Sequence, residues 1–93
     1  TNDLEKLNKI FATEKDDFTK LSIAKKIASL NKKEGAIKLV FLLKTSELPF
    51  YREEVYSEIK NLSGKNFGYD SEKSADKNKK ALNKILKWVK TIR

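Results

Sequence analysis

Apolar side chains recur along this chain every three to four residues, the spacing that gathers them on one face of an α-helix. The pattern predicts five helices, at about residues 1–15, 16–30, 34–45, 49–62 and 75–92. Residues 37–43 also fit a buried strand. We favour a helix there, because a single strand among helices would have no pairing partner.

Polar and helix-breaking residues mark the ends of these segments. Asn2 or Asp3 is suited to cap the first helix, and acidic residues 16–17 favour the start of the second. Residues 31–35 predict a turn before the third helix. Proline is favoured at the first helical position, which places the start of the fourth helix at Pro49, the only proline.

Part of the apolar pattern occurs twice. Phe18, Ile23, Ile27 and Leu30 recur thirty-two positions later as Phe50, Val55, Ile59 and Leu62. Ala36, Ile37, Val40 and Phe41 recur forty-five positions later as Ala81, Leu82, Ile85 and Leu86. Leu43 corresponds to Trp88 in the same register, which predicts a core position for this tryptophan. A helix pair repeated once, with an insertion in the second copy, is typical of stacked-helix proteins.

The insertion begins at Gly64, a favourable left-handed residue for ending a helix. Phe67 and Tyr69 are two positions apart, so in an extended segment both rings face the same side. We interpret the segment as a structured loop that folds over the end of the helix stack. The alternative is an aromatic contact surface for a partner.

Three stretches carry a resemblance to a known family. They are the helix pair of residues 17–44, the segment Leu48-Pro49-Phe50-Tyr51-Arg52, and the loop of residues 62–70 followed by the helix with Trp88. Together they resemble the HEAT-like repeats of bacterial α-solenoids, in the form with a period near thirty residues. Where that family has a small residue and a Val-Arg pair, this chain has Tyr51-Arg52 and Leu21-Ser22.

The resemblance implies an all-α fold of about five helices in antiparallel pairs, an α-solenoid fragment with a terminal capping loop and helix. We therefore expect one domain over residues 1–93. It consists of a leading helix at 1–15, a first repeat at 16–46 and a second at 47–93, with the loop inserted at 64–77. On this interpretation the segment is the C-terminal part of a longer chain.

Composition removes several kinds of chemistry. The chain contains no cysteine and no histidine, which excludes disulfides, thiol nucleophiles, the usual zinc sites and histidine bases. No apolar run approaches the ~18 residues that a transmembrane helix needs. We expect a soluble protein, and since the chain begins at Thr1 without a methionine, both a cytoplasmic and an exported location remain open.

Charge is unevenly distributed within a net +8. Residues 77–93 contain seven positive side chains and no acid. Three interpretations remain open: a solvated outer helix face, attraction to an acidic protein or an anionic membrane, and nucleic-acid binding. The chain has only two arginines, which weighs against nucleic acid. Membrane contact is disfavoured because the core needs Leu86 and Trp88.

No residue set indicates a reaction. The carboxylates at 53, 54 and 58 lie among basic residues, and Gly64-Lys65 lacks the rest of a phosphate-binding loop. We expect no enzyme activity and no cofactor. Our first hypothesis is a non-catalytic scaffold that binds another protein, possibly acidic. The second is a nucleic-acid-binding module that uses the lysines of the last helix. The predicted contact residues are Tyr51, Tyr56, Lys80, Lys84 and Lys87.

Overall fold

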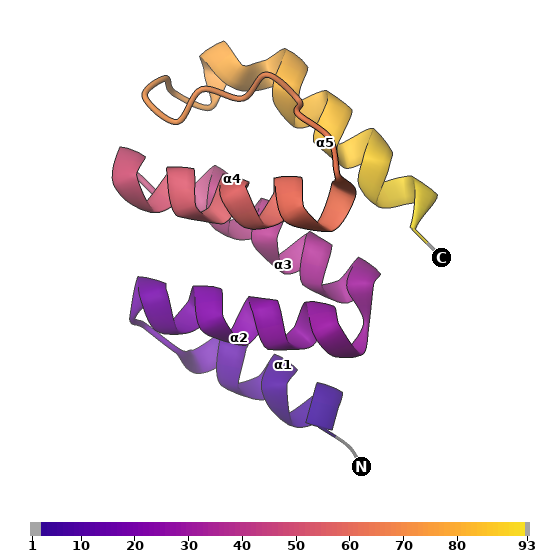
Figure 1. Cartoon of the computed structure of the whole chain (residues 1–93). Helices are drawn as coiled ribbons and strands as arrows, with labels where there is room; N and C mark the ends of the chain where they lie inside the picture. Colours follow the sequence, from indigo (N-terminus) through magenta and orange to yellow (C-terminus); the bar gives the residue numbers. More distant parts are fainter. Residues whose placement is uncertain (1–2, 93) are drawn as a thin grey trace.

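The computed structural model describes residues 3–92, and all regular structure in this range is helical (Figure 1). The all-α prediction is confirmed, and the strand alternative for residues 37–43 is wrong. Asn2, one of the two residues expected to cap the first helix, and the positively charged Arg93 lie outside the described residues. The elements are α1 (Asp3–Thr13), α2 (Asp17–Leu30), α3 (Lys32–Thr45), α4 (Pro49–Ser63), the 3-10 turn η1 (Asp76–Asn78) and α5 (Lys79–Thr91).

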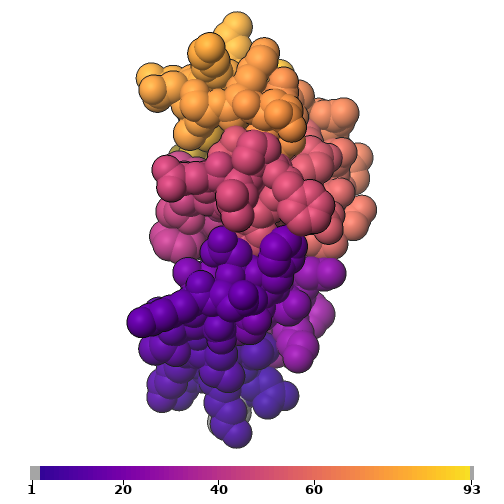
Figure 2. Space-filling model, turned by 90° about the vertical axis from the view of Figure 1, so that its left-hand side faces the viewer, coloured from indigo at the N-terminus to yellow at the C-terminus, as the bar shows by residue number. Residues whose placement is uncertain are grey.

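The five helices pack against one another in an elongated body of 40 × 29 × 17 Å. Helices α2 and α4 lie side by side, α3 packs against both, α1 packs against α2, and α5 packs against α3 (Figure 1). The chain advances from the indigo α1 at one end of the molecule to the yellow α5 at the other (Figure 1). Figure 2 faces the side of the molecule where α2 and α4 begin.

Helix α5 does not form the predicted antiparallel pair with α4. The loop after Gly64 runs back along α4, and the Arg52 guanidinium near the start of α4 donates to the Ser71 carbonyl at 2.7 Å. Consequently α5 begins at the same end as α4 and runs in the same direction, opposite to α3 (Figure 1). The match of residues 36–41 with 81–86 therefore reflects two amphipathic helices and not equivalent positions.

A single residue joins α2 to α3. The backbone N–H of Asn31 donates to the Ile27 carbonyl at 2.7 Å, and its side chain accepts from the Glu34 N–H at 3.0 Å. Asn31 thus ends one helix and caps the next, so the five-residue turn predicted at 31–35 is wrong. Gly35 lies inside α3, where a methyl group on its Cα would collide with the backbone of Ala28.

The loop after α4 is structured and largely covered. Gly64 and Gly68 have φ of 69° and 78°, values that favour glycine. Phe67 and Tyr69 are buried, and the Phe67 ring lies 6.0 Å from that of Trp88. The loop is structured with its aromatic rings covered, as expected, and the core position of Trp88 is confirmed. The alternative, a loop that exposes its aromatic rings to a partner, is wrong.

Asn78 anchors the other end of this loop. Its side chain is 3% exposed and makes four hydrogen bonds with the loop backbone. The Nδ2 group donates to the carbonyls of Asp70, Lys73 and Ser74 at 2.8–3.1 Å, and Oδ1 accepts from the Asp70 N–H at 2.9 Å. These bonds fix where α5 starts.

The core follows the apolar pattern only in part. Residues that are fully buried come from α2, α3, α4 and α5: Ile27, Leu39, Val55, Ile59 and Ile85. Five apolar positions of the repeat pattern, expected in the core, are exposed instead: Phe18, Leu30, Ile37, Phe41 and Phe50. Phe18 and Phe50 lie at the starts of α2 and α4, with ring centroids 6.0 Å apart.

Candidate functional site

The predicted contact residues fall into two groups. Lys80, Lys84 and Lys87 are exposed on α5, as a contact role requires. Tyr51 is fully buried and Tyr56 is 3% exposed. Neither tyrosine ring is accessible to a partner, so we assign both to the fold and not to a binding surface.

Tyr51 connects α4 to the start of α2. Its hydroxyl donates to the Asp17 carbonyl at 2.6 Å, and its ring meets the edge of Phe18 at 5.2 Å. Burial, with a smaller effect from the negative charges of Asp17 and Asp16, raises the pKa of Tyr51 to about 12. Tyr56 performs a similar role for the loop, since its hydroxyl donates to Asn66 Oδ1 and accepts from the Phe67 N–H.

The raised pKa of Tyr51 predicts a specific pH dependence of stability. Below pH 10 the hydroxyl is protonated in both states, so its contribution is complete. Between pH 10 and 12 the unfolded chain ionises first, which lowers the folding equilibrium constant by up to about tenfold per pH unit. We expect Tyr51→Phe to cost about 1 kcal/mol at pH 7, through the lost hydrogen bond. The difference in the free energy of unfolding between wild type and Tyr51→Phe should shrink above pH 10.

Urea denaturation of both proteins at pH 7, 9 and 11 measures this difference. Tyr56→Phe is the matched control because it also removes a hydroxyl that hydrogen-bonds in the interior. A constant gap between wild type and Tyr51→Phe at all three pH values would contradict the assignment.

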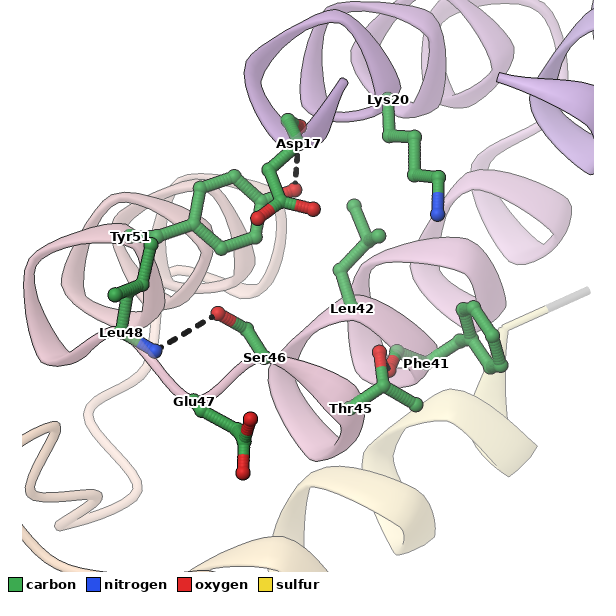
Figure 3. Close-up of a pocket in the computed structure, with 9 residues that line it drawn as sticks. All are labelled: Asp17, Lys20, Phe41, Leu42, Thr45, Ser46, Glu47, Leu48 and Tyr51. Atoms are coloured by element: carbon green, nitrogen blue, oxygen red, sulfur yellow. Dashed lines mark hydrogen bonds between the residues drawn. The ribbon is translucent and has the colours of Figure 1, made fainter. Parts of the chain in front are cut away.

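Two adjoining hollows lie beside the exposed ring of Phe41. The first, of about 390 Å³, lies where α2 and α4 begin and α3 ends (Figure 3). The second, of about 370 Å³, lies between α1 and α3. They share Lys20 and Phe41. We call the two together the Phe41 groove.

Large apolar side chains of the groove are open to solvent. Ile37 is 43% exposed, Phe41 50% and Leu48 56%. Phe18 and Phe50 extend this surface beside the first hollow, where Phe18 touches Tyr51. Contiguous apolar surface of this kind marks interaction sites in soluble proteins.

The groove exists because α1 covers α3 poorly. Helix α1 ends at Thr13 and reaches α3 through the ring contact of Phe11 with Phe41, at 6.3 Å. Helix α3 packs instead against α2, α4 and α5. Phe41 stays 50% exposed. The sequence predicted Ile37 and Phe41 as core residues, and no signal in the apolar spacing shows that they are exposed.

Charge in the groove differs between the two hollows. Asp17 and Glu47 line the first, together with Lys20 (Figure 3). The second has no carboxylate in its lining, but has Lys20 and Lys38 beside its apolar wall. Lys38 pairs with Glu34 at 4.0 Å, whereas Lys20 has no ion pair within residues 3–92. The second hollow is therefore apolar with a positive rim.

The wall of the second hollow also contains an unsatisfied polar atom. Asn8 lines it, and its buried Oδ1 accepts no hydrogen bond from the described part of the chain. A buried acceptor without a donor costs roughly 1–3 kcal/mol.

A smaller recess lies on the opposite part of the molecule, beside α5. It measures about 310 Å³ and is lined by Lys65, Phe67, Lys84, Lys87, Trp88 and Thr91. The helix and the preceding loop thus bring two of the predicted contact lysines together with Lys65, which the sequence did not single out. Lys80 lies on the same helix outside the recess.

Within residues 3–92, no group of three or more His, Cys, Asp or Glu side chains is arranged to hold a metal ion. In the same range, none of the helices has the length and apolar character needed to cross a membrane. Comparison of the chain with protein-family models, with curated proteins and with solved structures gives no match.

Proposed function

We propose that this chain is a non-catalytic protein-binding module of the HEAT-like α-solenoid type, and that the Phe41 groove is its binding site. The observation that carries the binding site is the exposure of Phe41, Leu48 and Phe50, at 50, 56 and 70%. A small domain gains about 25 cal/mol for each Å² of apolar surface that it buries. The free protein leaves these three large side chains exposed and does not gain this free energy. A partner that covers them would gain it on binding.

The solenoid proposal draws its support from α2 and α4. These helices lie side by side and carry the thirty-two-residue match. Ile27 and its counterpart Ile59 are both fully buried, while Phe18 and its counterpart Phe50 are both exposed and touch each other. Equal burial at matched positions is expected when successive repeats stack in register. The reversed α5 then closes the array.

We assign one occupant to the groove, an amphipathic helix of another protein that carries acidic residues. An apolar or aromatic anchor side chain fits a recess of about 370 Å³ walled by Phe11, Ile37 and Phe41. Lys20, unpaired within the described residues, lies at the rim of the second hollow, which no carboxylate lines, and attracts a carboxylate of the partner there. The chain's net charge of +8 favours an acidic partner over a basic one.

Selection from a library of random sixteen-residue segments tests this proposal. We expect enriched segments with aromatic or leucine residues at helical spacing and an excess of Asp and Glu. Ile37→Ala with Phe41→Ala should weaken their binding by about thirtyfold or more, because deeply docked anchor residues dominate interface energies. Isothermal titration calorimetry with synthetic segments measures the affinities.

The matched control is Ile10→Ala with Leu30→Ala, which removes apolar groups of similar exposure, 48 and 52%, on another surface. Binding should change less than twofold there. Equal losses in both double variants, or a library without enrichment, would contradict the proposal. Self-association that the Phe41 variant abolishes would assign the groove to a second copy of the chain instead.

A further inference from the structure

We infer that the recess beside α5 is a second binding site, specific for an acidic peptide segment. Three lysines surround it, at positions 65, 84 and 87, and no carboxylate lines it. Its floor is apolar, because the rings of Phe67 and Trp88 lie there 6.0 Å apart. A short segment with Asp or Glu residues matches the positive charge of these lysines.

The lysines of α5 are not neutralised by the fold. Helix α5 contains five lysines and no acidic residue. The ion pairs formed within residues 3–92 join Lys9 to Glu5, Lys25 to Glu58 and Lys38 to Glu34, so none involves α5.

Lysines three or four positions apart on a helix repel each other, and each such pair destabilises the helix. Lys80 and Lys84 have this spacing, as do Lys84 and Lys87, and Lys87 and Lys90. Among residues 3–92, no acidic side chain forms an ion pair with these lysines. An acidic ligand at Lys84 and Lys87 relieves the repulsion, so binding gains from an unfavourable feature of the free protein.

Peptide is favoured over nucleic acid by the state of the aromatic rings. Phe67 is 7% exposed and Trp88 8%, so neither ring offers a face on which a base could stack. The recess also lacks arginine, whose planar group binds phosphate with two hydrogen bonds. A lysine ammonium group pairs with a single carboxylate and does not need the planar two-bond arrangement.

Trp88 allows a direct test because it is the only tryptophan. Titration with decaglutamate, which has no aromatic group, should change the emission of Trp88 in a saturable way at low salt. Lys84→Gln with Lys87→Gln should weaken the binding about tenfold, as expected from the loss of two ion pairs at a partly covered site.

The control variant is Lys26→Gln with Lys33→Gln, two exposed lysines away from the recess that carry the same total charge. It should bind within about twofold of wild type and keep the emission change. Equal weakening of both double variants would reduce the effect to net charge and overturn the inference. So would an unchanged Trp88 emission. Tighter binding of a ten-nucleotide single strand, with the same emission change, would assign the recess to nucleic acid.

The recess and the Phe41 groove share no lining residue, so the two proposals can fail separately. Ile37→Ala with Phe41→Ala should leave the decaglutamate titration unchanged. A loss of decaglutamate binding in that variant would contradict the assignment of the recess as an independent site.

Discussion

Gly35→Ala is expected to destabilise the protein by about 2–3 kcal/mol, although alanine is the better helix former by about 1 kcal/mol. Gly35 lies inside α3 at the place where this helix crosses α2. A methyl group there would collide with Cα, Cβ and N of Ala28, and two of these atoms are backbone. The helices must move apart, which loosens the packing around Ile27 and Leu39.

Urea denaturation monitored by circular dichroism measures this effect. Ala28→Gly should not restore the stability of Gly35→Ala, because the Cα and N of residue 28 remain in place. Lys33→Ala, an exposed position on the same helix, serves as control and should change stability by less than about 0.5 kcal/mol. A Gly35→Ala variant more stable than wild type would show that α2 and α3 do not cross as closely as described.

Asn78→Asp should destabilise the protein about as much as Gly35→Ala, by roughly 3 kcal/mol. The substitution keeps the shape of the side chain but removes the Nδ2 group, which donates to three backbone carbonyls. It also puts a negative charge beside these oxygens at a position that is only 3% exposed. Buried acceptors without donors and a buried charge without a partner are each costly.

Asn66→Asp provides a matched control in the same loop. Asn66 uses its Oδ1 as an acceptor from the Tyr56 hydroxyl and the Gly68 N–H, and an aspartate keeps both bonds. The stability of the Asn66→Asp variant should stay within about 0.5 kcal/mol of wild type. At pH 4 the gap between Asn78→Asp and wild type should narrow, because a protonated carboxyl can again donate. Equal losses in the two variants would refute the role given to Asn78.

Much of the fold can be predicted from local patterns. Pro49 and Gly64 mark the ends of α4 in the sequence and in the structure, because the constraints of proline and glycine act within one turn. Two aromatic residues spaced for one side of an extended segment, Phe67 and Tyr69, are indeed covered together. Trp88 lies in the core as its place in the apolar stripe predicts.

Features that depend on two distant segments could not be predicted. Gly35 resembles a turn residue, and only the crossing with Ala28 explains why it lies inside a helix. The direction of α5 depends on a loop that runs back along α4, and Arg52 holds that loop by donating to the Ser71 carbonyl. Every residue has a backbone carbonyl, so the sequence does not show which carbonyl will accept such a bond.

The candidate site was the least predictable part. Tyr51 and Tyr56 have the amphipathic character of contact residues, but their hydroxyls find partners in the interior. Ile37 and Phe41 have the spacing of core residues, but both remain exposed beside a hollow between α1 and α3. Whether an apolar side chain is covered depends on its neighbours in space, which helical periodicity does not record.

The most direct test of the Phe41 groove is the carbon–proton NMR spectrum of the isoleucine methyl groups during titration with a segment selected against this chain. Three isoleucines report on different places: Ile37 in the groove, Ile10 on another exposed surface, and Ile85 in the core. The account predicts a saturable shift of the Ile37 methyl signals, with Ile10 and Ile85 unchanged. A shift at Ile10 with Ile37 unaffected, or binding that moves none of them, would contradict it.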